Sequence, residues 1–238
     1  MRFEIFRYDA TQPEEPRFDV FHLTPSPGMS VLEAILRIQD EQDPSLSFRY
    51  ACRSAVCGSC GMAINGRLAL ACRVQLDRLD TDRVVLEPMP NLEIIRDLVV
   101  DMDPFWEKYE RVQPWLHAEM IPGQESRMSP KERDRIDQYV NCILCALCYA
   151  ACPVIRSNEG FTGPAALAKL YRFLADPREQ RDPGTLEQEN RRQGVWGCHT
   201  ITRCIQVCPK RVRPTDGIEG VRRKLVVHRF KKLVGKER

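Results

Sequence analysis

Apolar and polar side chains alternate along residues 3–8 and again along residues 17–23, which is the pattern of two half-buried β-strands. Residues 61–70 contain Asn65-Gly66 at their centre, and this dipeptide is the strongest short-range signal for a hairpin turn. Residues 83–88 add one more strand. The pattern therefore predicts a small sheet within the first hundred residues.

A helix is predicted to interrupt these strands. Ser30 and Glu33 have the spacing of a capping box, in which each residue caps the backbone N–H group of the other. Four side chains follow at helical spacing: Leu32, Ile35, Leu36 and Gln39. Asp43-Pro44 is expected to end the helix. Residues 1–104 are thus expected to form one domain of mixed α and β structure.

Residues 105–238 show helical periodicity and almost no alternation, so a second, helical domain is expected there. Ser129 and Glu132 form another capping box, with Pro130 at the first helical position. A helix is expected from Pro164 onward, with apolar positions at Leu167, Leu170, Tyr171 and Leu174. Residues 91–115 are expected to connect the two domains, and residues 176–184 to form a loop. A terminal helix is expected over residues 215–233.

Composition changes this picture little. The chain has 238 residues, 43% hydrophobic and 29% charged residues and a net charge of +3, values that are ordinary for a globular protein. No apolar run approaches the ~20 residues needed to cross a bilayer. The first residues pass directly into the alternating pattern without a signal peptide. We therefore expect an intracellular chain, or one from which a leader has been removed.

The eleven cysteines fit a disulfide framework poorly, because their number is odd and an intracellular compartment keeps thiols reduced. Their spacing instead indicates iron–sulfur ligation. Cys142, Cys145, Cys148 and Cys152 precede Pro153 with the C-x2-C-x2-C-x3-C-P spacing of bacterial ferredoxins. In that pattern three thiolates hold one cluster, and the fourth holds a different one.

The second run of this ferredoxin pattern is incomplete, because Ile201 stands where one cysteine is expected. A complete set of four remains for a [4Fe–4S] cluster: Cys142, Cys145, Cys148 and Cys208. The other cluster is left with three ligands: Cys152, Cys198 and Cys204. Since isoleucine cannot bind iron, we expect a [3Fe–4S] cluster at this second position.

The remaining four cysteines have the plant-type ferredoxin spacing C-x4-C-x2-C…C of a [2Fe–2S] site: Cys52, Cys57, Cys60 and Cys72. Gly58, Ser59 and Gly61 let the backbone curl close to the sulfurs, and their N–H groups are candidate hydrogen-bond donors to them. Zinc is the alternative. Zinc is disfavoured in this set because Cys72 stands alone where a second pair of cysteines is expected. In the ferredoxin-type run it is disfavoured because zinc prefers paired cysteines to C-x2-C-x2-C triplets.

Three clusters in one chain predict an electron-transfer protein. Cluster type, charge, hydrogen bonding and exposure set the reduction potential. With one iron fewer and the apolar Ile201 as a neighbour, the [3Fe–4S] cluster is expected to be the easiest of the three to reduce.

This order of a plant-type [2Fe–2S] unit and an interrupted two-cluster unit resembles the iron–sulfur subunit of succinate dehydrogenase and fumarate reductase, respiratory complex II. Three further segments carry the resemblance: residues 46–52, 94–101 and 163–166. It covers nearly the whole chain. It implies an α+β chain, in which an N-terminal plant-type ferredoxin (β-grasp) domain precedes an all-helical bacterial-type two-cluster ferredoxin domain.

The resemblance also implies partners. The subunit would pass electrons between a flavoprotein, which interconverts succinate and fumarate at FAD, and quinone in a membrane anchor with or without haem b. The complex would lie on the cytoplasmic face of the plasma membrane. The chain itself would carry no FAD, no substrate site and no catalytic residue. Pro153, His199 and Ile201 match positions that line the quinone pocket of succinate dehydrogenases. His199 could donate a hydrogen bond or a proton to the quinone, or could simply form hydrogen bonds near the cluster.

The direction of electron flow stays open. Arg156 and Ser157 stand where many succinate dehydrogenases have a Trp, and residues 149–153 and 194–196 resemble fumarate reductases instead. His199, in contrast, is often absent from fumarate reductases. A further alternative is the iron–sulfur subunit of another flavin dehydrogenase, such as one that oxidises glycolate or glycerol 3-phosphate. Those subunits resemble the second half only.

The C-terminal segment is basic, with eleven Lys or Arg between Lys210 and Arg238 against three acidic residues. Six of these cations are candidates to contact anionic lipid head groups: Arg222, Arg223, Lys224, Arg229, Lys231 and Lys232. The alternative, which the sequence supports equally well, is that these cations form a solvated helix face. Nucleic-acid binding is not expected, because aromatic side chains do not alternate with these charges. The other three histidines show no ligand spacing: His22, His117 and His228.

Overall fold

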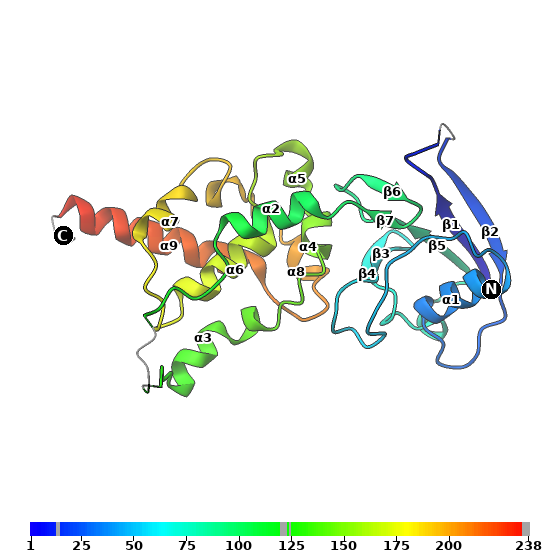
Figure 1. Cartoon of the computed structure of the whole chain (residues 1–238), viewed down its shortest axis with the longest axis horizontal. Coiled ribbons are helices and arrows are strands. Elements are labelled where there is room, and N and C mark those ends of the chain that lie inside the picture. Colours follow the sequence, from blue (N-terminus) through cyan, green and yellow to red (C-terminus); the bar gives the residue numbers. More distant parts are fainter. Residues whose placement is uncertain (13–14, 120–122, 124, 235–238) are drawn as a thin grey trace. The chain divides into compact units, whose positions relative to one another are not determined.

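The computed structural model describes residues 1–12, 15–119, 123 and 125–234. The chain forms two compact units (Figure 1). The first unit comprises Met1–Pro104 and Ile143–Ala151, and the second comprises Phe105–Cys142 and Cys152–Arg238. The first ferredoxin-type cysteine run is therefore divided between the two units.

A five-stranded mixed sheet organises the first unit, in the order β2-β1-β5-β3-β4. Its strands are β1 (Arg2–Arg7), β2 (Arg17–His22), β3 (Gly61–Ile64), β4 (Arg67–Leu70) and β5 (Arg83–Glu87). β1 pairs antiparallel with β2 and parallel with β5, while β3 pairs antiparallel with β4 and β5. The β3–β4 turn has φ of 48° at Asn65 and 72° at Gly66, as a two-residue hairpin turn with positive φ at both positions requires. All the strands expected from the alternation are confirmed.

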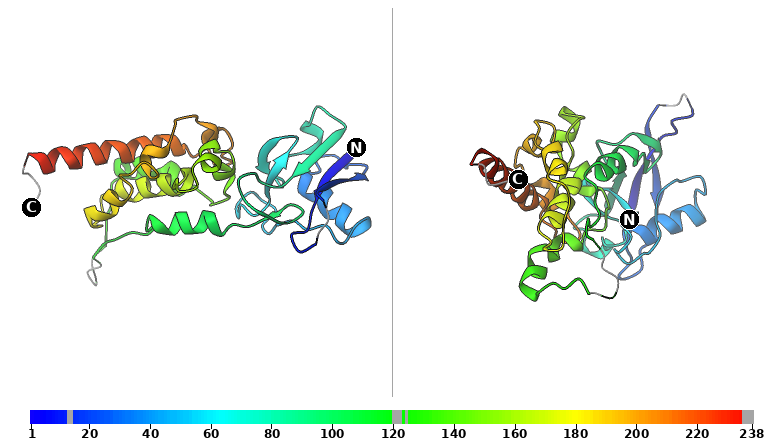
Figure 2. Two further views of the ribbon diagram at one scale, coloured as in Figure 1. Left: turned by 90° about the horizontal axis from the view of Figure 1, so that it is seen from above. Right: turned by 60° about the vertical axis from the view of Figure 1, so that its left-hand side comes forward.

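Helix α1 (Val31–Glu41) lies across this sheet (Figure 2) and begins at Ser30 with the predicted capping box. Its buried side chains are Val31, Leu32, Ala34, Ile35 and Ile38. The expected face was therefore wrong at Leu36 and Gln39, which are only half-buried. The Gln39 amide Nε2 instead donates to the carbonyl of Leu46 at 2.7 Å, so it serves the following loop and not the core.

The segment expected as a plain connection contains two short strands, β6 (Ile94–Arg96) and β7 (Val99–Val100), which pair antiparallel. At three and two residues they are too short for alternation to reveal. Asp97 lies between them and is almost fully buried. Its carboxylate accepts hydrogen bonds from Arg7 Nε at 3.1 Å, from the Tyr8 amide at 3.2 Å and from the Ser47 amide at 2.8 Å. The first unit also contains η1 (Leu76–Arg78) and α4 (Leu147–Ala150).

Helices are the only regular elements among the described residues of the second unit. Its α-helices include α3 (Pro130–Val140), α5 (Pro153–Ser157), α6 (Pro164–Leu174), α7 (Pro183–Gln188), α8 (Arg203–Gln206) and α9 (Pro214–Leu233). The 3₁₀ turn η2 (Val195–Gly197) lies between α7 and α8. Helix α2 (Asp103–Arg111) lies in the segment expected as a connection, and α7 begins inside the expected loop, where Asp182 caps it before Pro183. The capping box of α3 and the Pro164 start of α6 are confirmed.

The core of the second unit lies between α6 and α9. A side-chain carbon at Gly220 would collide with the Tyr171 ring, and one at Gly217 would lie 3.1 Å from Ala168 Cα, so small residues on α9 permit this close approach. On α6, Leu167 and Leu170 are buried as expected, but Phe173 completes the buried face, while Tyr171 and Leu174 are half-buried. In the part of the chain that the structure describes, no helix combines the length and the hydrophobicity needed to cross a membrane.

Candidate functional site

The β3–β4 hairpin positions two of the four cysteines in the plant-type set. Cys60 directly precedes β3 and Cys72 follows β4, and the pairing of Gly61 with Leu70 brings both to the same end of the hairpin. The Ala71 amide donates to the Cys60 carbonyl at 2.9 Å, which continues the ladder up to this end.

Backbone N–H groups surround the other two sulfurs. Cys52 Sγ accepts from the amides of Ser54 (3.4 Å), Val56 (3.3 Å) and Cys57 (3.2 Å). Cys57 Sγ accepts from the amides of Cys52 (3.4 Å) and Ser59 (3.5 Å). Ser59 was named from the sequence, but Ser54 and Val56 were not. Their orientation depends on positive φ at Arg53 and Ala55 (55° and 54°), which these residue types do not signal.

The thiols of this loop also influence one another. Hydrogen bonds from the Ser59 side chain and the Cys52 amide lower the pKa of Cys57 to about 6. Burial raises the pKa of Cys60 to about 12, and the neighbouring Cys72 and Cys57 sulfurs add to this rise. The structure therefore brings all four cysteines of the plant-type set together, with backbone N–H groups directed at Cys52 and Cys57.

Gly58 explains how closely the loop packs within its unit. Its φ is +78°, and a side-chain carbon there would lie 2.8 Å from Cys145 Cβ and 3.0 Å from the Ile143 carbonyl. Gly61 has the same role, because its added carbon would lie 3.1 Å from Leu147 Cδ2. The plant-type loop thus lies directly against the first ferredoxin-type loop.

The two ferredoxin-type runs repeat one backbone conformation. Leu144 and Ala146 have φ of 54° and 59°, and Thr200 and Thr202 have φ of 57° and 64°. A one-turn helix follows in each run, α4 after Ala146 and α8 after Thr202. By this correspondence Ile201 occupies the position that Cys145 has in the first run.

A cavity in the second unit brings together the three cysteines of the incomplete set: Cys152, Cys198 and Cys204. The three candidate quinone-site residues line the same cavity, and all three are exposed: Pro153, His199 and Ile201. Burial raises the pKa of Cys204, and the neighbouring Cys198 and Cys152 sulfurs add to this rise. The three sulfurs are therefore close enough to interact electrostatically, and Ile201 lines the same cavity.

The predicted [4Fe–4S] ligands are divided between the units. Cys142 and Cys208 belong to the second unit and pack against its cluster of Tyr139, Ala168 and Val212. Cys208 Sγ accepts the Val212 amide at 3.2 Å. Cys145 and Cys148 belong to the first unit. The assignment of these four cysteines to one cluster stays a prediction.

Two polar side chains near the incomplete set were missed in the sequence. The Thr215 hydroxyl lies 3.3 Å from Cys204 Sγ and is buried. Arg222 was expected among the head-group cations, but its guanidinium turns inward. It donates to the carbonyls of Cys198 (2.7 Å) and Val195 (3.1 Å) and lies 5.4 Å from the Trp196 ring centroid. Helical spacing from Ile218, which is buried, is the signal that could have placed Arg222 on the inner face.

Among the described residues, no group of three or more His, Cys, Asp or Glu side chains is arranged to hold a single metal ion. Two family models match the chain. Residues 2–107 match the 2Fe-2S iron-sulfur cluster binding domain, and residues 138–212 match the 4Fe-4S dicluster domain.

Curated relatives match almost the whole length. The succinate dehydrogenase iron-sulfur subunit of Coxiella burnetii is 39% identical over 230 residues, which covers 95% of this chain and 97% of the relative. The subunit of the same name from Paracoccus denitrificans is 36% identical over 228 residues, covering 94% and 88%. The chain belongs to the family of succinate dehydrogenase iron–sulfur subunits.

A solved structure agrees with this family assignment. A chain of the Mycobacterium smegmatis Sdh1 complex in the apo form superimposes with a TM-score of 0.86 at 26% identity, covering 96% of both chains. The α+β fold expected from the resemblance is confirmed: a ferredoxin-type [2Fe–2S] domain followed by a helical two-cluster domain. As an iron–sulfur subunit of succinate dehydrogenase, the chain is an electron-transfer part of an oxidoreductase complex.

Proposed function

We propose that this subunit relays electrons from the FAD of a flavoprotein partner to quinone beside a membrane-anchor partner. Three thiolate sets would hold the carriers. The [2Fe–2S] set is Cys52, Cys57, Cys60 and Cys72, the [4Fe–4S] set is Cys142, Cys145, Cys148 and Cys208, and the [3Fe–4S] set is Cys152, Cys198 and Cys204. When bound, such clusters supply one-electron redox centres. The observation that carries the proposal is the cavity where three cysteines meet Ile201 and His199.

The chain's own residues adjust these centres. N–H and O–H groups that donate to a ligand sulfur stabilise the reduced, more negative state and raise its potential. Ser54, Val56 and Ser59 supply such donors in the plant-type loop. The Thr215 hydroxyl is placed to do so at Cys204. Ile201 excludes a fourth thiolate at the last centre.

Quinone reduction also needs a proton. His199 is exposed on the cavity that Cys198 and Cys152 line, so its imidazole is accessible to a ligand bound there. An imidazole can donate a hydrogen bond or pass a proton to such a ligand. We therefore propose Pro153, His199 and Ile201 as this chain's part of the quinone site.

The names of the curated relatives favour succinate oxidation as the physiological direction. Fumarate reduction by the same chain of centres is the second candidate, favoured by the resemblance of residues 149–153 and 194–196 to fumarate reductases. We also propose a peripheral position on the cytoplasmic face of the plasma membrane, and residues 1–104 and 105–238 as the [2Fe–2S] domain and the helical two-cluster domain. A membrane-anchor partner, with or without haem b, belongs to the same proposal.

Anaerobic purification with iron and sulfide analysis, together with EPR of the oxidised and reduced protein, tests this function. About nine irons per chain are expected from one cluster of each type, with a three-iron signal in the oxidised state that disappears on reduction. Zinc without labile sulfide would remove the electron-transfer proposal. About ten irons without an oxidised-state signal would overturn only the [3Fe–4S] assignment.

A further inference from the structure

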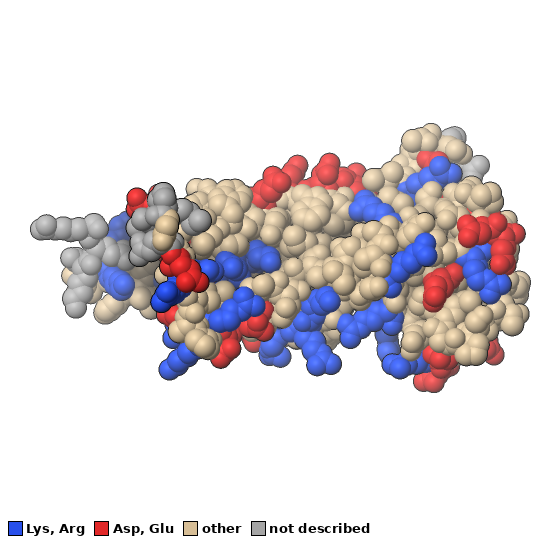
Figure 3. Space-filling view, turned by 60° about the horizontal axis from the view of Figure 1, so that its bottom comes forward, with Lys and Arg blue, Asp and Glu red and all other residues tan. Residues whose placement is uncertain are grey.

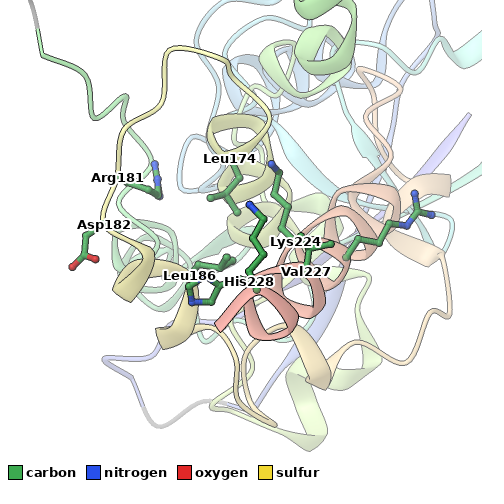
Figure 4. A pocket seen from close by; sticks show the side chains of 9 residues that line it. Leu174, Arg181, Asp182, Leu186, Lys224, Val227 and His228 are labelled. Atoms are coloured by element: carbon green, nitrogen blue, oxygen red, sulfur yellow. The ribbon is translucent and has the colours of Figure 1, made fainter. Parts of the chain in front are cut away.

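A second cavity of the helical unit lies between α9 and the segment that joins α6 to α7 (Figure 4). Its volume is about 450 Å³, within the usual range of ligand pockets. It shares no lining residue with the cavity of the incomplete cysteine set. Leu174, Leu186 and Val227 form an apolar wall, and we call this cavity the α9 cleft.

Three cations on α9 line the same cleft: Arg223, Lys224 and Lys231. Within the described part of the chain, none of the three takes part in an ion pair. Loss of hydration lowers the pKa of Lys224, and the positive charges of Arg135 and Lys231 lower it further. The cleft therefore concentrates positive charge that an anionic ligand would neutralise.

The other charged side chains of the cleft have protein partners. Arg181 is buried, and its guanidinium donates to the carbonyls of Val112 (3.1 Å) and Trp115 (3.0 Å). The Asp182 carboxylate accepts the Gly184 amide at 3.0 Å and points away from the centre of the cleft in Figure 4.

His228 also has a protein partner, because its Nε2 lies 3.5 Å from Glu187 Oε1. Lys224 and His228 extend from α9 on the same side as Leu174 and Leu186 (Figure 4). The unneutralised charge of the cleft is thus positive and comes from α9.

A short exposed apolar stripe lies on another face of α9. Val226, Phe230 and Leu233 lie at i, i+4 and i+7 on α9 and are 58%, 66% and 85% exposed. The C-terminal half of α9 projects beyond the other helices of its unit (Figures 1 and 2). These three side chains lie on a different face of α9 from Lys224 and Lys231, so they are not part of the cleft.

The basic side chains on the visible face of the helical unit form separate groups with acidic groups between them (Figure 3). The face in this view is therefore not uniformly basic, and the α9 cleft is characterised by its own side chains. Its distinguishing feature is local, namely unpaired cations next to an apolar wall.

We propose that the α9 cleft binds an anionic phospholipid. The lipid phosphate would lie between Lys224 and Lys231, and its acyl chains would contact Leu174, Leu186 and Val227. A free phosphate would use the cations but leave the apolar wall exposed. The proposal does not depend on the electron relay.

Cosedimentation of the cluster-loaded full chain with lipid vesicles at constant ionic strength tests this site. Vesicles of phosphatidylcholine alone are expected to bind little, and vesicles that also contain phosphatidylglycerol are expected to bind strongly. Lys224→Gln/Lys231→Gln should weaken binding to the anionic vesicles on the order of tenfold or more. Absence of binding to the anionic vesicles would refute the proposal.

Arg229→Gln/Lys232→Gln is the matched control, because it removes two charges from the same helix at positions that do not line the cleft. We expect a clearly smaller loss of binding for this variant. Equal losses of binding in the two variants would indicate a general attraction between charges and would contradict a lipid site in the α9 cleft. The visible absorption of the clusters, unchanged in both, would verify that each variant is folded.

Val227→Trp tests the apolar part, because it fills the cleft without changing the charge and Val227 is itself half exposed. It should also weaken binding to the anionic vesicles, whereas a wild-type value would contradict an acyl-chain site. Inorganic phosphate is the remaining probe. It should displace the protein from vesicles no better than chloride at the same ionic strength, and specific displacement would assign the site to a free anion instead.

Discussion

At Ile201 the backbone already has the conformation that surrounds Cys145 in the first ferredoxin-type run, with left-handed residues on both sides. The side chain is 46% exposed, so a smaller residue there removes little core packing. Ile201→Cys should therefore supply the missing thiolate. The expected result is about ten irons per chain in place of about nine and loss of the three-iron EPR signal in the oxidised state.

Ile201→Val is the control, since it keeps an apolar side chain that cannot bind iron. It should retain both the iron content and the oxidised-state signal of the wild type. If Ile201→Cys behaved in the same way, the correspondence between Ile201 and Cys145 would be wrong.

A pair of glycines with similar backbone angles allows the packing of the plant-type loop to be measured. Gly58 and Gly66 have φ of +78° and +72°, but only Gly58 has neighbours within 4 Å of an added side-chain carbon. Gly66→Ala should cost about 1 kcal/mol of backbone strain. Gly58→Ala should cost roughly 1–3 kcal/mol more, because the added carbon meets Cys145 Cβ and the Ile143 carbonyl.

Thermal unfolding of the two cluster-loaded variants, followed by visible circular dichroism, gives the comparison. Gly58→Ala should also lose [2Fe–2S] signal intensity, while Gly66→Ala retains it. Equal stabilities would mean that the loop does not pack closely against the Cys145 segment.

At the residue scale, the sequence predicted which cysteines act as ligands but not which groups donate hydrogen bonds to their sulfurs. Cysteine spacing alone indicated which sulfurs share a site, because each set follows a fixed ligand pattern. The donors of Ser54 and Val56 were not predictable, since they depend on left-handed residues that are not glycine. Thr215 was missed because it lies eleven residues beyond its Cys204 partner and only the start of α9 brings them together.

At the scale of elements, a buried carboxylate joins three parts of the first unit. Asp97, 2% exposed, accepts from Arg7 at the end of β1, from Tyr8, and from Ser47 before the plant-type loop. Asp97→Ala should lower the free energy of unfolding by about 3 kcal/mol, because it leaves a buried guanidinium and two amides without this acceptor. Chemical denaturation would measure the loss.

Asp19→Ala is the matched control for this network. Asp19 also pairs with Arg7, at 3.1 Å, but its side chain is 31% exposed and the backbone amides do not depend on it. It should cost well under half as much. A loss of stability as large as that of Asp97→Ala would mean that pairing the charge of Arg7 stabilises the unit, and not the hydrogen bonds of Asp97 to the two backbone amides.

The elements themselves were predictable where local signals are strong. Capping boxes located α1 and α3, and Asn65-Gly66 located the β3–β4 turn. The short strands β6 and β7 were not predictable, because two or three residues show no periodicity and the pair is held by tertiary contacts through Asp97. The division of the first cysteine run between the two units has no local signal either.

At the scale of the whole chain, the proposed relay requires an order of potentials. The last centre has three thiolates, because Ile201 supplies no fourth, and the Thr215 hydroxyl lies beside Cys204. The smaller negative charge and the hydroxyl donor both favour the reduced state. Potentiometric EPR titration should therefore find the [3Fe–4S] cluster the easiest of the three to reduce. A potential below both other clusters would contradict the direction of flow toward the His199 cavity.

Thr215→Val tests the cause of that order. It removes the hydroxyl 3.3 Å from Cys204 Sγ and retains a side chain of similar shape, so the cysteine set and the start of α9 should persist. The potential of the third cluster should fall, because a donor to its ligand sulfur is lost. The [2Fe–2S] potential, whose nearest donors are Ser54, Val56 and Ser59, should not change. Electron transfer from succinate to quinone in the assembled complex should slow in step with the lower potential, since the final step then has a smaller driving force. An unchanged third potential would remove Thr215 from the relay and leave the three-thiolate ligation and Ile201 as the sources of the gradient.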